Sequence, residues 1–143
     1  MGNLAHGSRE TTASCDSVWD LLADVDRWPT TFARHLKQAR LDGPLETGTT
    51  AVVENRSPPT RTTFTVHSVS PGRRFGWSGT IMGLTMDFDH RCESTEGGGC
   101  RVVFDVDLDG PLAGLIRPIV RPLYEPKMQR ALDLLIQLAE GTD

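Results

Sequence analysis

The sequence predicts an α+β domain, in which an antiparallel sheet and its helices occupy separate parts of the chain. The apolar residues first follow a helical period, then alternate with polar residues along six consecutive segments, and then return to a helical period. Short turns separate the alternating segments, which indicates antiparallel neighbours. A run of strands with helices outside it is typical of the α+β class.

The first part of the chain predicts an edge strand and two short helices. The opening dozen residues are polar and are expected to form a weak edge strand. Ser14 or Asp16 can cap the helix that follows. Its apolar residues recur at helical spacing: Val18, Leu21, Leu22 and Val25, with Trp19 beside them. Pro29 is expected to end this helix or to begin a second one that continues to Phe32.

From residue 36 onward the period changes to alternation, which predicts six more strands. They cover 36–42, 48–55, 61–70, 73–80, 83–94 and 100–109. Glycine and proline mark the turns between them. The alternation also predicts the inward-facing side chains: Ala51, Val53, Asn55, Phe64, Val66, Phe75, Trp77, Leu84, Met86, Phe88, His90, Cys92, Val102, Phe104, Val106 and Leu108.

The helical period that returns after residue 111 continues to about residue 139. Only this element is long enough to cover the concave face of a curved sheet. Three prolines stand four apart within it: Pro118, Pro122 and Pro126. An interior proline costs a helix about 3 kcal/mol. Two interpretations remain open: a kinked or irregular gate over 112–126, or a helix that begins only near residue 123 or 126. Both place a firmly packed helix at 127–139.

Composition and charge argue against several classes of protein. A chain of 143 residues suits one domain over 1–143, and 38% hydrophobic with 24% charged residues is typical of a globular protein. A net charge of -4 with scattered basic residues argues against a nucleic-acid partner.

No apolar run approaches the roughly 18 residues of a membrane span, and the N-terminus lacks the apolar core of a signal peptide. We expect a cytoplasmic monomer or homodimer without membrane insertion.

The cysteines and histidines give no sign of a metal or a disulfide framework. Cys15, Cys92 and Cys100 form an odd set without a CxxC pair, so we expect reduced thiols. Cys92 and Cys100 flank a glycine-rich turn, and a disulfide between them across a hairpin is the alternative. No HxxxH or HExxH spacing is present. We therefore expect neither a metal nor another cofactor.

Several stretches of the chain resemble one superfamily. ASCDSVWDLL at 13–22 and DVDRWP at 24–29 resemble the opening of START/Bet v 1-like (SRPBCC) proteins. More narrowly, they are similar to the polyketide cyclase/dehydrase group. RLDGPL at 40–45, PGRRFGW at 71–77 and GGGCRV at 97–102 are also similar to that group. The resemblance covers nearly the whole chain and is specific for a fold rather than for a reaction.

The resemblance implies a helix-grip fold. In that fold a curved seven-stranded antiparallel sheet wraps around a long C-terminal helix, and two short helices follow the first strand. It also implies a deep apolar cavity between sheet and helix. Some members close or dehydrate aromatic rings in biosynthesis without a cofactor, whereas others carry or sense a lipid, a quinone or another lipophilic molecule.

Three inward polar residues are candidates for catalysis. His90 lies on the apolar face of a central strand and could move a proton, or it could be a hydrogen-bonded core residue. Tyr124 could donate to a ligand carbonyl and stabilise an enolate, or it could lie at a rim. Asn55 could hold a ligand oxygen, or it could belong to the turn that follows it.

Other residues are candidates for binding. The expected apolar lining consists of Phe32, Val53, Phe64, Trp77, Met82, Met86, Phe88, Phe104, Leu115 and Ile119. The alternative for these residues is an ordinary filled core. His35 could stand at the cavity mouth, and Arg34 and Arg61 could orient an acidic or phenolate substrate. A solvated surface position is the default for all three.

The sequence thus favours a domain that takes a hydrophobic small molecule as ligand or substrate. The first hypothesis is a cofactor-free polyketide cyclase/dehydratase, whose cavity supplies shape and desolvation. The second is a non-catalytic carrier or sensor of a lipid, a quinone or another lipophilic ligand. A regulatory protein that binds another protein is a third.

Overall fold

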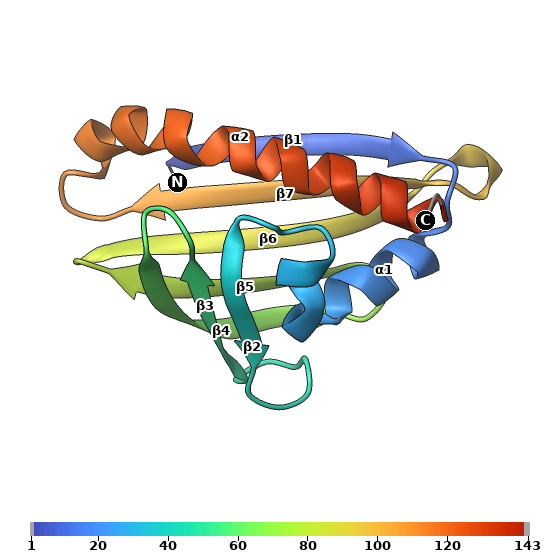
Figure 1. The fold of residues 1–143 in the computed structure, drawn as a ribbon, viewed down its shortest axis with the longest axis horizontal. Coiled ribbons are helices and arrows are strands. Elements are labelled where there is room, and N and C mark those ends of the chain that lie inside the picture. The colour runs from blue at the N-terminus through green and yellow to red at the C-terminus, as the bar shows by residue number, and fades with distance from the viewer. Residues whose placement is uncertain (1, 142–143) are drawn as a thin grey trace.

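The computed structural model describes residues 2–141, and it is built on one curved sheet with a long helix along two of its strands (Figure 1). The elements are β1 (Asn3–Thr11), α1 (Cys15–Ala23), the 3-10 helix η1 (Val25–Thr30), β2 (Leu36–Leu41), β3 (Thr50–Asn55), β4 (Thr60–Ser70), β5 (Arg74–Ile81), β6 (Leu84–Ser94), the short 3-10 helix η2 (Glu96–Gly98), β7 (Cys100–Asp109) and α2 (Ala113–Ala139). The predicted order of strands and helices is confirmed.

The sheet is seven-stranded and antiparallel, in the order β1-β7-β6-β5-β4-β3-β2. After β1 the chain crosses through α1 and η1 to the opposite edge, and then returns strand by strand to β7 beside β1. The register places Phe75 opposite His90 and Phe88 opposite Val106. Inward side chains of neighbouring strands therefore lie side by side on the concave face.

The two short helices form as their caps and apolar residues predict. The Ser14 side chain accepts from the backbone N of Ser17 at 3.2 Å and so caps α1. Trp28 in η1 donates through Nε1 to the carbonyl oxygen of Leu22 at 3.0 Å in a buried position. This bond ties η1 to α1 and turns the Trp28 ring towards the inside of the sheet.

Close contacts fix α2 against β1. Arg9 Nε of β1 lies 2.8 Å from Asp133 Oδ1 of α2. At Gly7 the strand approaches the helix so closely that a Cβ atom would lie 2.4 Å from Leu132 Cδ1. Any larger residue at position 7 would therefore force the Leu132 side chain or the helix to move.

The final helix is continuous from residue 113 to residue 139 and includes all three prolines: Pro118, Pro122 and Pro126 (Figure 1). The interpretation in which it begins only near residue 123 or 126 is therefore wrong, and 113–126 is helix rather than an irregular loop. The prolines free the carbonyls of residues 114, 118 and 122 from their usual donors. All three residues are exposed, so water can donate to the freed carbonyls.

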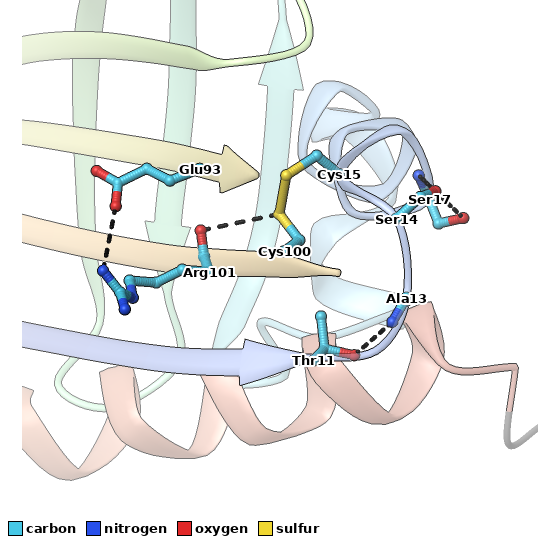
Figure 2. Close-up of a disulfide and its surroundings, with 8 residues drawn as sticks. All are labelled: Thr11, Ala13, Ser14, Cys15, Ser17, Glu93, Cys100 and Arg101. Carbon is cyan, nitrogen blue, oxygen red and sulfur yellow. Dashed lines mark hydrogen bonds and ion pairs between the residues drawn. A yellow bond between two sulfur atoms is a disulfide. The ribbon is translucent and has the colours of Figure 1, made fainter. Parts of the chain in front are cut away.

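A disulfide joins Cys15 to Cys100, with their Cα atoms 5.0 Å apart (Figure 2). The prediction of three reduced thiols is wrong. The alternative pairing of Cys92 with Cys100 is also wrong, because Cys92 is a buried free cysteine. The observed pairing follows from the sheet register, since Thr11 lies opposite Cys100 and α1 begins shortly afterwards with Cys15.

Within residues 2–141, no helix combines the length and apolar character needed to cross a bilayer.

The disulfide bears on the expected location of the protein. The expected cytoplasmic location rested partly on reduced cysteines, and disulfides persist mainly in oxidising compartments. A cytoplasmic location therefore stays a prediction.

Reducing the disulfide should destabilise the fold. The bond spans a sequence separation of 85 residues, and loop-closure entropy predicts a loss of about 4 kcal/mol in the free energy of unfolding. We expect the wild-type protein to unfold at lower denaturant concentration after reduction, as followed by tryptophan fluorescence. In the Cys15→Ser/Cys100→Ser control, reductant should leave the midpoint unchanged. A wild-type midpoint unmoved by complete reduction would contradict the prediction.

Candidate functional site

A cavity of about 520 Å³ lies between the concave face of the sheet, η1 and α2. All but two of the predicted site residues line it: Phe32, Val53, Asn55, Phe64, Trp77, Met82, Met86, Phe88, His90, Phe104 and Tyr124. A volume of this size is typical of small-molecule pockets. The core beneath α2 is therefore only partly filled by the chain's own side chains.

Leu115 and Ile119 do not line the cavity, which corrects their assignment to the binding set. Their side chains are 69% and 67% exposed. The next residues along the helix, Ile116 and Val120, line the cavity instead. The reason is the phase of α2, because the stripe that contains the exposed prolines turns Leu115 and Ile119 towards solvent.

The opening of the cavity lies among α2, the β3–β4 turn and the β5–β6 hairpin. Each contributes a lining residue that is also exposed: Leu123, Pro58 and Met82. Met82 sits at the hairpin tip and is 94% exposed. An apolar molecule that enters here meets apolar side chains before it reaches the interior.

His90 lies at the inner end of the cavity within a cluster of aromatic rings. The ring-centroid distances from His90 are 4.4 Å to Phe75, 5.2 Å to Phe104, 5.5 Å to Trp28, 5.9 Å to Trp77 and 6.3 Å to Phe88. The residue is 5% exposed. Burial lowers its pKa from 6.5 to about 4, so the ring is neutral at neutral pH.

The tautomer of His90 follows from its single polar contact. Nδ1 lies 3.2 Å from the carbonyl oxygen of Phe75. A carbonyl oxygen can only accept, so Nδ1 carries the proton and Nε2 keeps its lone pair. His90 thus offers a weakly basic acceptor within an otherwise apolar wall.

Tyr124 contributes a hydroxyl to the same cavity. Its ring meets Phe88 edge-on with centroids 6.2 Å apart. Burial raises the pKa of this phenol, so the hydroxyl stays protonated. Among the residues that the structure describes, no group forms a hydrogen bond with this hydroxyl. It is therefore free to donate to a ligand oxygen.

Asn55 combines the two roles considered for it. It lines the cavity, and its Nδ2 also donates to Thr60 Oγ1 at 3.0 Å across the β3–β4 pair. Part of its hydrogen-bonding capacity is thus used in the turn. Its carbonyl oxygen can still accept from a ligand.

Sequence reasoning left His35 either at the cavity mouth or, by default, on the surface, and it did not consider Lys127. His35 lines the cavity and is partly buried, and burial together with the charge of Lys127 lowers its pKa to about 4. Lys127 also lines the cavity, and its Nζ donates to the carbonyl oxygen of Ser57. The missed signal was helical spacing, because Lys127 follows Val120 and Tyr124 on the inward stripe of α2. Arg34 and Arg61 are exposed.

The sequence profile of one family, described as "Polyketide cyclase / dehydrase and lipid transport", matches residues 5–140. No curated protein matches the sequence at a significant level. Among solved structures, a hypothetical protein from Helicobacter pylori superposes with a TM-score of 0.79 and 15% identity, over 94% of this chain and 86% of that one.

Two further structures have the same fold. A START superfamily protein from Mycobacterium smegmatis has a TM-score of 0.75 and 11% identity, over 96% of this chain and 97% of that one. The Zhui aromatase/cyclase from Streptomyces sp. R1128 has a TM-score of 0.75 and 16% identity, over 94% and 92% of the two chains. At these identities the likeness establishes the helix-grip fold alone.

The buried histidines should make the fold sensitive to acid. The unfolded chain protonates His90 near pH 6.5, whereas the folded protein does so only near pH 4. The unfolded state therefore binds more protons between these values, and the free energy of unfolding falls as the pH drops. Protonation of His90 accounts for a decrease of about 3 kcal/mol in the free energy of unfolding.

Denaturant titrations between neutral pH and pH 4 test this expectation. His90→Phe removes the titrating group and should flatten the decline relative to wild type. If the free energy of unfolding of His90→Phe fell with pH as steeply as that of wild type, His90 would not cause the acid sensitivity.

Proposed function

The chain belongs to the polyketide cyclase/dehydrase and lipid transport family, and we propose that it takes a largely apolar small molecule into its cavity and acts on it without a cofactor, as a cyclase or dehydratase. The observation that carries the proposal is the cavity of about 520 Å³, whose aromatic wall is interrupted by the hydroxyl of Tyr124 and by His90. The name of the structurally similar Zhui aromatase/cyclase supports the choice of reaction class.

The proposed chemistry uses the cavity wall to fold and desolvate a polyketide-like substrate. Tyr124 donates a hydrogen bond to a substrate carbonyl, which stabilises the oxygen as it becomes enolate-like. His90 takes the α-proton at Nε2. Because the pKa of His90 is lowered to about 4, it holds this proton only briefly. It returns the proton to a hydroxyl group on the β-carbon as the enolate collapses to the carbonyl, so that the Cβ–O bond breaks, a Cα=Cβ double bond forms and water departs.

A carrier function is the second candidate, and one observation favours it. The base that the reaction needs has a pKa of about 4 and lies among aromatic rings. Both properties weaken general-base catalysis near neutral pH. A carrier would use the same cavity and the same Tyr124 donor without turnover.

Blocking the cavity should abolish uptake of a neutral apolar probe. Ala131 lines the cavity from α2, and Ala131→Phe places a ring in the ligand space. We expect the fluorescence titration of N-phenylnaphthylamine to show saturable binding to wild type and at least tenfold weaker binding to this variant. Leu138→Phe adds a ring at an exposed position of the same helix and should bind as wild type. Absence of saturable binding to wild type would contradict the proposal.

Turnover should depend on the Tyr124 hydroxyl more than binding does. Tyr124→Phe removes one donor to the developing enolate and should lower the rate about a hundredfold, with probe affinity retained. The rate is measured as the absorbance change when a poly-β-ketone thioester cyclises or loses water. His90→Gln should also lower it, whereas His67→Gln on the outer face should not. Binding without any rate above the uncatalysed reaction would favour the carrier.

A further inference from the structure

One charged side chain at the cavity has no counterion among the residues that the structure describes. Six titratable residues border the space: His35, Asp89, His90, Asp105, Tyr124 and Lys127. The phenol of Tyr124 stays protonated and carries no charge. The lowered pKa values of the two histidines leave them neutral at neutral pH. Lys127 is therefore the basic residue that brings a positive charge to the cavity.

The two aspartates do not balance this charge, because their carboxylates are engaged elsewhere. Asp89 Oδ1 lies 3.0 Å from Arg74 and its Oδ2 lies 2.7 Å from Arg91. Asp105 Oδ1 lies 2.6 Å from His6 and its Oδ2 lies 3.3 Å from Arg91. Within residues 2–141, no carboxylate forms an ion pair with Lys127.

The Lys127 ammonium is held in place by an uncharged partner. Its Nζ donates to the carbonyl oxygen of Ser57 in the β3–β4 turn, which bridges α2 and the sheet beside the opening. An ammonium group carries three N–H donors. One is used by Ser57, so two remain for a ligand while the side chain stays in position.

The surroundings of Lys127 add positive charge. Arg56 Nε donates to the carbonyl oxygen of Arg34 at 3.3 Å, and the backbone N of Arg56 donates to the carbonyl oxygen of His35 at 3.2 Å. These bonds hold two exposed arginines beside the same turn. Basic side chains therefore gather beside this turn although the whole chain has a net charge of -4.

We infer that the ligand of this cavity is an amphipathic acid, whose carboxylate binds the Lys127 ammonium at the opening and whose apolar body lies against the aromatic wall. This inference rests on the proposed function and narrows its substrate class. A carboxylate supplies the missing counterion and accepts the two unused N–H groups. Tyr124, on the same stripe of α2, lines the same cavity and can contact the same ligand.

A pair of matched probes tests the inference. Pyrenebutyric acid and pyrenebutanol share one apolar body and differ in the head group, and their binding is followed by fluorescence at neutral pH. We expect wild type to bind the acid roughly tenfold to a hundredfold more tightly than the alcohol, as is usual for a charge-assisted hydrogen bond. Lys127→Met should lose this preference by weakening acid binding, and Lys127→Arg should retain it.

The chain supplies a matched control, because Lys37 and Lys127 are its two lysines. Lys37 is an exposed residue of β2 that does not line the cavity, so Lys37→Met should keep the wild-type preference. Repeating the titrations at high salt screens the exposed arginines, and the preference that depends on Lys127 should persist. A merely structural Lys127 would change stability without changing the acid-to-alcohol ratio.

The outcomes separate the inference from the proposed function. If the alcohol binds wild type but the acid gains no preference, or if Lys127→Met keeps the preference, the acid-binding role is overturned and the cavity function stands. If neither pyrenebutanol nor N-phenylnaphthylamine binds wild type, both are overturned.

Discussion

Antiparallel pairing between β1 and β7 joins the two ends of the chain, with Gly7 opposite Phe104 and Thr11 opposite Cys100. The other features of the fold depend on this contact. It provides the surface on which α2 packs, and the close approach at Gly7 sets the distance between helix and sheet. It also brings the start of α1 to the start of β7, where the disulfide forms (Figure 2).

The cavity exists because this arrangement holds α2 away from the middle of the sheet. The helix lies along β1 and β7 and makes most of its contacts with β1 (Figure 1). The side chains of the other strands do not fill the space that remains, which is the cavity. The apolar wall makes water a poor occupant of most of that space. Polar groups of Tyr124, His90 and Lys127 interrupt this apolar wall.

The sequence predicted the strands and their inner faces accurately, because the alternation of apolar and polar residues determines both. Alternation identified the strands and placed Phe88 and His90 on the inner face, and the Ser14 cap was visible in the sequence. The sequence did not predict correctly which residues of α2 face the cavity, because this depends on the rotational phase of the helix. Proline spacing obscured that phase, so Leu115 and Ile119 were placed inside although Ile116 and Val120 occupy that side.

The sequence by itself determined the element order and the inward faces of β3 to β7, because these depend on local periods of two and 3.6 residues. The resemblance of its motifs to a known superfamily implied the helix-grip class. Only the tertiary structure decided the Cys15–Cys100 bond, since it depends on the pairing of strands from opposite ends of the chain. It also decided the inward position of Lys127 and the partial burial of His35. Helical spacing places Lys127 on one stripe with Val120 and Tyr124, but only the packing of α2 over the sheet shows that this stripe lines a cavity.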